Sequence, residues 1–180
     1  MISLRAKETK AVLGYLFLHE EAELYVNEMV RKFSLDDGNL SRKLKELAGE
    51  GILKCRESAN ACYYSLNRQY PLLKEYKGIV LKTIGLEQKL RDVLSGVQGI
   101  EQAFIFGSYA KGTMDAASDI DLLVVGEHDT LAVQKAVARV QKETDREINM
   151  ISWGSREYKE RLGKDPFLKS LKDKKKVQLV

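Results

Sequence analysis

The sequence predicts an α+β protein with an N-terminal domain over residues 1–67, a connecting helix over residues 68–97 and a C-terminal domain over residues 98–180. Apolar residues first recur every three to four positions, which indicates helices. They then alternate with polar residues over "ILKCRE" and "CYYSLN", which indicates a hairpin. From Gln98 onward predicted strands and helices alternate, which is typical of a small α/β or α+β domain with a mostly mixed sheet.

The composition is that of a soluble globular protein, with 44% hydrophobic and 31% charged residues among 180. The N-terminus lacks a signal-peptide core, and no uncharged apolar run approaches the roughly 18 to 20 residues of a membrane span. We therefore expect a cytoplasmic protein that does not enter a membrane. The two histidines, His19 and His128, are too few for a His-rich metal site.

Two cysteines, Cys55 and Cys62, are too few for a disulfide scaffold or a four-ligand zinc site, and the cytoplasm would keep them reduced. Pairing of the two strands across "SANA" would place Cys55 directly opposite Cys62. Two interpretations stay open: the cysteines are two small apolar residues of the hairpin, or they form a redox switch.

The N-terminal domain is predicted to contain three helices before the hairpin. The second, "VNEMVRKF", and the third, "NLSRKLKELAGEG", each carry one apolar stripe at helical spacing. Residues 31–56 contain seven Lys/Arg and four Asp/Glu, although the whole chain has a net charge of only +4. Positive charge is thus concentrated on the third helix and the hairpin.

Residues 4–67 resemble a winged helix-turn-helix in the "LSRKLKELAGEGIL" run and the closing "YYSLN". The resemblance implies that a recognition helix from about Gly38 to Glu50 enters the major groove of double-stranded DNA and that the hairpin contacts phosphate. The implied DNA-binding residues are Asn39, Ser41, Arg42 and Lys43 on the helix and Lys54 and Arg56 on the hairpin. The alternatives are a solvated charged face and a winged helix that binds protein.

The connecting segment "YPLLKEYKGIVLKTIGLEQKLRDVL" contains a heptad seam, spaced alternately by four and three residues. Its members are Leu72, Tyr76, Ile79, Thr83, Leu86, Leu90 and Val93. The seam predicts a homodimer through residues 70–94, and the alternative is that its second half packs against the C-terminal domain.

Two aspartates, Asp119 and Asp121, precede the apolar run of a predicted strand. Because side chains alternate along a strand, both project to the same side. Two carboxylates about 6 Å apart repel by about 3 kcal/mol at an effective dielectric constant of 20. A divalent cation offsets this repulsion, and Mg²⁺ typically takes one or two protein carboxylates together with phosphate oxygens and water.

The phosphate site is expected just upstream, where Gly107 follows an apolar strand and Ser108 opens a short helix. Glycine lets the backbone turn sharply and approach a ligand closely, and the helix start offers free N–H groups to an anion. A P-loop is excluded, because no Gly-Lys-Ser/Thr follows.

Gly107-Ser108, ten further residues and then Asp119-Ile120-Asp121, within "FGSYAKG" and "SDIDLLVV", resemble the minimal nucleotidyltransferases of the DNA polymerase beta superfamily. The resemblance covers residues 84–180. It implies that Gly107 and Ser108 hold a nucleoside triphosphate and that Asp119 and Asp121 bind two Mg²⁺ ions and serve catalysis. The implied reaction transfers a nucleotidyl group to an acceptor hydroxyl and releases pyrophosphate. Lys111 is placed to approach the phosphates, or is a solvated loop lysine.

One departure from the family concerns its third acidic residue, which lies on a later strand. Aligning "REINMISW" with that strand puts Asn149 at the acidic position, and Glu147, two residues earlier on the same face, is the candidate substitute as a catalytic residue. Two functions therefore stay open: a nucleotidyltransferase, or a DNA-binding transcriptional regulator that senses nucleotide without turnover. A third possibility, from the family resemblance, is a toxin-antitoxin role, since small transferases of this type often modify a partner protein.

Overall fold

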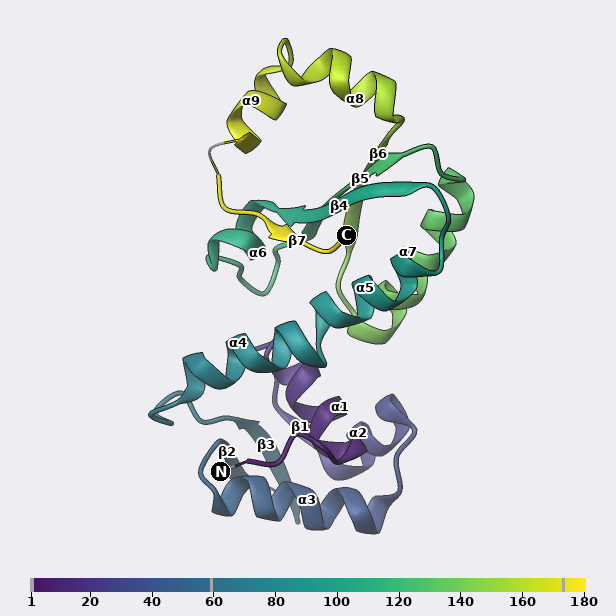
Figure 1. Ribbon diagram of the computed structural model, residues 1–180. Helices are drawn as coiled ribbons and strands as arrows, with labels where there is room; N and C mark the ends of the chain where they lie inside the picture. Colours follow the sequence, from purple (N-terminus) through teal and green to yellow (C-terminus); the bar gives the residue numbers. More distant parts are fainter. Residues whose placement is uncertain (1, 59, 173) are drawn as a thin grey trace. The chain divides into compact units, whose positions relative to one another are not determined.

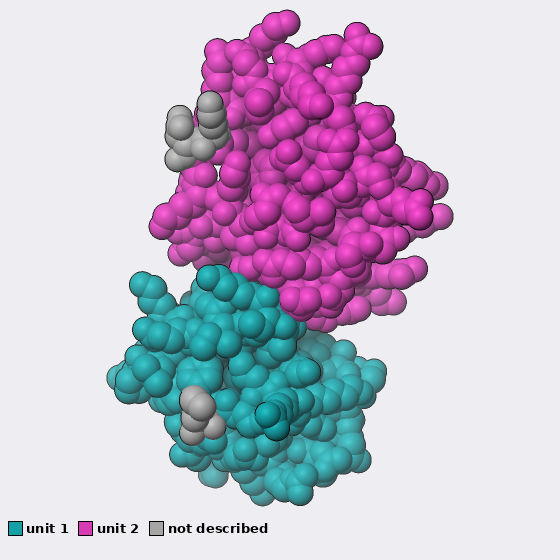
Figure 2. Space-filling view, in the orientation of Figure 1, with its two compact units in different colours: residues 1–86 teal, residues 87–180 magenta. Residues whose placement is uncertain are grey.

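A computed structural model of the chain describes residues 2–58, 60–172 and 174–180. The chain divides into two compact units, an N-terminal unit, Met1–Leu86, and a C-terminal unit, Glu87–Val180 (Figure 2). In the described part of the chain, the helices are too short or too polar to cross a membrane.

The N-terminal unit combines helices with a three-stranded antiparallel sheet, in the strand order β1-β3-β2 (Figure 1). In chain order its elements are α1 (Lys7–Leu16), β1 (Leu24–Tyr25), α2 (Val26–Phe33), α3 (Asp37–Gly49), β2 (Leu53–Ser58), β3 (Ala61–Leu66) and α4 (Leu73–Thr83). The three predicted helices and the hairpin that follows them are confirmed.

Local chemistry explains where α3 begins and which face it buries. The Asp36 carboxylate accepts a hydrogen bond from the Asn39 amide at 2.8 Å and thereby caps the helix. Leu40, Leu44 and Leu47, at spacings of four and three, are all buried. The opposite face of α3 is therefore available for polar and basic side chains.

The hairpin register differs from the expected one. Ser58, the last residue of β2, pairs with Ala61, the first residue of β3. Cys55 therefore lies opposite Tyr64, and Cys62 lies opposite Glu57. The prediction that the cysteines face each other directly is wrong because Cys55 lies three residues before Ser58, whereas Cys62 lies only one residue after Ala61, so the two are not equally distant from the turn.

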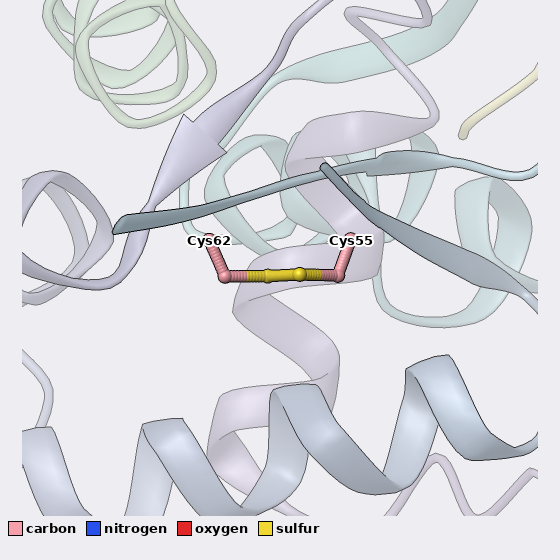
Figure 3. The surroundings of a disulfide bond; sticks show 2 residues. All are labelled: Cys55 and Cys62. Atoms are coloured by element: carbon pink, nitrogen blue, oxygen red, sulfur yellow. A yellow bond between two sulfur atoms is a disulfide. The ribbon is translucent and has the colours of Figure 1, made fainter. Parts of the chain in front are cut away.

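The two cysteines nevertheless share one face of the hairpin and are joined in a disulfide (Figure 3). Their Cα atoms are 5.6 Å apart, which is within the range that a disulfide spans. The expectation that both stay reduced is thus also corrected, since the diagonal arrangement brings the two side chains together.

The predicted single connecting helix is divided into α4 and α5 (Leu86–Ser95). At the break, the Gly85 amide donates to the Val80 carbonyl at 2.7 Å. A Cβ atom at Gly85 would lie 2.8 Å from the Leu81 Cα atom, so this tight turn requires glycine. Apolar residues keep their helical spacing on both sides of Gly85, so the sequence pattern predicted one continuous helix.

The heptad seam does not form one exposed stripe. Leu72 and Ile79 are exposed, whereas Tyr76, Leu86 and Leu90 are buried in the chain. A homodimer through residues 70–94 stays a prediction, for which only part of the seam is accessible.

The C-terminal unit contains a four-stranded mixed sheet in the order β6-β5-β4-β7, in which β5 and β6 are parallel and the other pairs antiparallel. After α5 its elements are β4 (Ile100–Phe106), α6 (Gly107–Lys111), β5 (Ile120–Gly126), α7 (Thr130–Thr144), β6 (Ile148–Trp153), α8 (Ser155–Leu162), α9 (Pro166–Lys172) and β7 (Val177–Gln178). The prediction of a small mixed sheet with alternating helices is confirmed.

Helices lie on both sides of this sheet, with α5 and α7 on one side and α8 and α9 on the other (Figure 1). On the α8–α9 side, Phe104 and Leu123 belong to an apolar cluster with Leu168 and Leu171. This apolar face continues toward the start of β5, where it becomes polar.

Candidate active site

The apolar face of the sheet ends at a row of three residues on neighbouring strands, of which two are polar. Phe106 of β4 lies opposite Asp121 of β5, and Asp121 lies opposite Asn149 of β6. The next row is apolar, with Phe104, Leu123 and its β6 partner in register. Asp121 is therefore at the edge of the buried face, with its backbone fixed by a strand on either side.

Gly107 brings the chain directly against Asp121. Its φ of +71° is in the left-handed region, and a Cβ atom there would lie 2.0 Å from Oδ2 of Asp121. Only glycine permits both this conformation and this approach. The sequence predicted that Gly107 lets the backbone approach a ligand, and the structure adds that it packs against one of the two candidate metal ligands.

Electrostatic repulsion is present at the aspartate pair, as the sequence suggested. Partial burial raises the pKa of Asp121, and the negative charge of Asp119 raises it further. Asp119 lies just before β5 and is exposed, and its Oδ2 accepts a hydrogen bond of 3.1 Å from Nδ2 of Asn149. The amide thus stabilises one carboxylate of the pair without adding a negative charge.

The loop between α6 and β5 is held from the other side by Arg146, which lies between α7 and β6. Its guanidinium donates to the carbonyl oxygens of Ala116 at 2.7 Å and Ser118 at 3.3 Å. Arg146 is only 6% exposed. This buried clamp fixes the backbone immediately before Asp119.

A local turn supports the same loop. The Asp115 carboxylate accepts hydrogen bonds from the Ser118 hydroxyl at 2.7 Å and from the Ala117 amide at 3.0 Å. These bonds, that from the Ser118 hydroxyl above all, lower the pKa of Asp115. The segment between the two halves of the motif is therefore ordered by its own side chains as well as by Arg146.

The remaining predicted site residues lie on α6 and at the start of β6. Ser108 is partly buried and Lys111 is exposed, both on α6, which follows directly from β4. Glu147 is exposed, and its carbonyl accepts from the Ile120 amide at 2.9 Å, which extends the β5–β6 pairing. By strand alternation Glu147 is on the same face as Asn149.

The donor set fits magnesium. In the described residues, no group of three or more His, Cys, Asp or Glu side chains is close enough to hold a metal ion. Asp119 and Asp121 are thus a pair of carboxylates that belongs to no larger acidic group among the described residues. Two carboxylates are what Mg²⁺ commonly takes from a protein when phosphate oxygens and water supply the rest.

The candidate DNA-binding residues of the N-terminal unit are largely engaged within the chain. Arg42 donates to the Asn39 side chain at 3.2 Å, and the Lys43 ammonium lies 2.6 Å from Glu46. Ser41 donates to Asp37 at 3.3 Å. Phosphate binding by Lys43 would have to compete with an acidic neighbour.

The hairpin carries the other two candidates. Lys54 and Arg56 are exposed on β2, and the Arg56 guanidinium lies 2.6 Å from Glu23 and 5.2 Å from the centre of the Tyr63 ring. This pairing lowers the pKa of the Glu23 carboxyl through the hydrogen bond from Arg56. Arg56 is therefore held in place against the sheet, with its charge locally balanced.

Three residues that support elements of the site were not identified in the sequence. Tyr109 of α6 hydrogen-bonds to Glu87 over 22 positions, and Arg146 holds the loop between α6 and β5 over 28 and 30 positions. Tyr109 is within "FGSYAKG", where its place in the motif was the available hint. Neither Arg146 nor Glu87 belongs to a motif, so composition and spacing could not identify them.

Comparison with known proteins gives one family match. Residues 86–178 match the family model described as "Nucleotidyltransferase domain". No curated protein matches the chain.

Similar solved structures include a chain of a toxin-antitoxin crystallised with AMP-PNP, with 21% identity and a TM-score of 0.38 over 52% of this chain and 72% of that chain. Another is a "putative nucleotidyltransferase" from Sulfolobus solfataricus, with 26% identity and a TM-score of 0.29 over 42% of this chain and 68% of that chain.

Proposed function

The chain belongs, through residues 86–178, to the nucleotidyltransferase domain family, and we propose that it binds a nucleoside triphosphate with Mg²⁺ and transfers the nucleotidyl group to an acceptor hydroxyl. The carrying observation is the contact between the two halves of the motif. The Gly107 backbone meets the Asp121 carboxylate, and Asp119, which lies just before β5, is on the same face by strand alternation. A triphosphate at Gly107 and a cation at the aspartates would therefore be neighbours.

Each residue has a distinct role in this proposal. Gly107 and Ser108 bind the triphosphate, and Lys111 approaches it from the exposed side of α6. Asp119 and Asp121 would hold Mg²⁺, two ions when nucleotide is bound. When bound, the metal supplies positive charge that neutralises the leaving pyrophosphate and lowers the pKa of the acceptor hydroxyl.

Of the steps in this reaction, activation of the attacking hydroxyl has the fewest candidate residues. Asn149 lies opposite Asp121 and hydrogen-bonds to Asp119, but an amide cannot accept a proton at neutral pH. Glu147 is the proposed base, because it is the nearest acidic residue on that strand face and is exposed to an incoming acceptor.

A second candidate function is favoured by the same amide. If Glu147 does not reach the acceptor, the site binds nucleotide and metal without turnover, and the protein is a nucleotide-sensing regulator. The hydrogen bond between Asn149 and Asp119 supports this candidate, because the Asn149 amide stabilises a carboxylate that could bind metal but cannot itself act as the base.

The decisive experiment separates binding from turnover. Calorimetry with each of the four nucleoside triphosphates and Mg²⁺ measures binding, and the double variant Asp119→Asn/Asp121→Asn is expected to abolish it. Unchanged affinity in that variant would refute the metal assignment. Pyrophosphate release, assayed with DNA, RNA and cell extract as acceptors, measures turnover.

The two candidates differ in the variants of β6. For an enzyme, Glu147→Gln should lower turnover by about 10²-fold or more with little change in affinity, the usual scale for losing a positioned base. For a sensor, the wild type binds without releasing pyrophosphate, and Asn149→Asp is the variant in which release would appear.

For the N-terminal unit we propose a winged helix that binds double-stranded DNA through α3 and the β2–β3 hairpin. Support comes from the arrangement of three helices followed by the hairpin and from the basic residues on α3 and β2, which are Arg42, Lys43, Lys54 and Arg56.

Replacing Arg42 and Lys43 by Ala should weaken duplex binding and reduce its salt slope by about 0.9 for each lost phosphate contact. Glu46→Gln is the matched control, because it frees Lys43 from its acidic neighbour and should strengthen binding. A wild type that binds no duplex at low salt would assign this unit to another partner.

A further inference from the structure

A polar network around one buried carboxylate, Glu87, links α5, α6 and β7 in the C-terminal unit. The Tyr109 hydroxyl of α6 donates to Oε1 of Glu87 at 3.2 Å. Nη2 of Arg91, one helical turn after Glu87, lies 3.4 Å from Oε2 of the same carboxylate and donates to the Gln178 carbonyl at 3.2 Å. Tyr109 of α6 and Arg91 of α5 thus meet at one carboxylate, and Arg91 connects it to β7.

Burial makes this network costly to break. Glu87 is only 4% exposed, and a buried carboxylate is tolerated only when it is paired and hydrogen-bonded. Burial, and then the Glu87 charge, raise the pKa of Tyr109, so its hydroxyl stays protonated and donates at any working pH. Tyr109 is therefore tied to Glu87 by a charge-assisted hydrogen bond.

The position of Tyr109 gives the network its bearing on the site. Tyr109 is two residues after Gly107 and one after Ser108, on a helix of only five residues. So short a helix has little stability of its own and depends on tertiary contacts for its orientation. Gly107 packs closely against the Asp121 carboxylate, so the orientation of α6 sets how the two halves of the motif meet.

We propose that Tyr109 is a positioning residue, which acts through Glu87 and Arg91 to hold α6, and with it Gly107 and Ser108, in the geometry that binds a nucleoside triphosphate beside Asp121. This inference rests on the proposed nucleotide-binding function and adds the means by which its phosphate-binding half is fixed. Tyr109 itself touches neither the substrate nor the metal in this proposal.

The main test uses Tyr109→Phe, which keeps the ring and removes the hydroxyl. Two backbone amides report on α6 directly, because Gly112 donates to the Tyr109 carbonyl and Thr113 to the Ser108 carbonyl, both at 3.0 Å. We expect their hydrogen exchange to accelerate about three- to tenfold, and the affinity for Mg²⁺ with a nucleoside triphosphate to fall by a similar factor, the scale of one hydrogen bond.

A matched control separates positioning from general loss of stability. Val133→Ala removes buried methyl groups from α7 and should lower the stability of the same unit. It is expected to leave both the nucleotide affinity and the exchange of Gly112 and Thr113 relative to β5 amides unchanged. In a Glu87→Leu background, Tyr109→Phe should have little further effect on affinity, since the hydroxyl acts through that carboxylate.

The outcomes are distinguishable. Unchanged exchange at Gly112 and Thr113 in Tyr109→Phe would overturn the proposal. If the wild type binds nucleotide, faster exchange in Tyr109→Phe without a loss of nucleotide affinity would also overturn it. A wild type that binds no nucleotide would instead refute the proposed function, and the exchange rates would then decide alone whether the network holds α6.

Discussion

Replacing Gly107 by Ala tests the contact on which the candidate site depends. At φ +71° an alanine has to adopt the left-handed conformation, which costs about 1–2 kcal/mol and is partly offset by the lower entropy of the unfolded chain. The added Cβ would also lie 2.0 Å from Oδ2 and 3.0 Å from Cγ of Asp121. The carboxylate must move by the difference between 2.0 Å and the 3.4 Å at which ordinary contact begins.

Gly112→Ala is the matched control, because Gly112 has almost the same φ, +75°, at the other end of α6 and has no neighbouring atom within 4 Å of its would-be Cβ. Both variants carry the backbone strain, and only Gly107→Ala carries the overlap. Forced overlaps in packed sites cost about 1–3 kcal/mol. We expect Gly107→Ala to lose that much more unfolding free energy than Gly112→Ala and to bind nucleotide more weakly.

Urea unfolding followed by tryptophan fluorescence measures the difference in the right unit. Trp153 is the single tryptophan of the chain, and it packs with Tyr158 and Phe167 in the C-terminal unit. Adding Asp121→Ala to Gly107→Ala should recover the extra loss, since the overlapping carboxylate is gone. Equal losses in Gly107→Ala and Gly112→Ala would refute the reasoning.

Two further predictions concern charge and the loop clamp. The pKa of Asp121 is raised in the folded state, so ionisation of this carboxyl opposes folding. In metal-free protein, the stability relative to Asp121→Asn should therefore be greatest below the unfolded pKa of about 3.9 and should decline as the pH rises through the folded pKa. Urea unfolding in EDTA across pH 3 to 7 measures this dependence. Arg146→Met should cost about 2 kcal/mol and weaken nucleotide binding, because the Ala116 and Ser118 carbonyls lose a charged donor, whereas Arg146→Lys should retain part of both; equal losses in the two variants would contradict the clamp.

Features that depend on a period or a short motif were predictable from the sequence. Alternation placed Asp119 and Asp121 on one strand face, and the aligned apolar run placed Asn149 beside them. The observed pairing of Asp121 with Asn149 agrees with that alignment. Such inferences need only neighbours along the chain, whose geometry is fixed by the strand itself.

Features that depend on turns and long-range contacts were not predictable. The division between α4 and α5 depends on how closely Gly85 approaches Leu81, and the cysteine register depends on where the hairpin turn is centred. The Arg146 clamp joins residues 28 or 30 positions apart. No local pattern records such distances, because they are set by how the elements pack.

Because Asn149 is neutral, the unliganded site has the charges of Asp119 and Asp121 alone. The effect of replacing Asn149 by Asp follows from the geometry. The Nδ2 atom is 3.1 Å from Oδ2 of Asp119, so Asn149→Asp exchanges a hydrogen bond for a repulsion of about 1 kcal/mol even at the dielectric constant of water. Metal-free Asn149→Asp should therefore unfold at lower urea concentration than the wild type. Mg²⁺ should stabilise it more than it stabilises the wild type, because a third carboxylate adds a ligand and a charge to neutralise. If Mg²⁺ stabilises both proteins equally, Asn149 does not face the metal-binding side of the aspartate pair, and the distinction between transferase and sensor cannot depend on this residue.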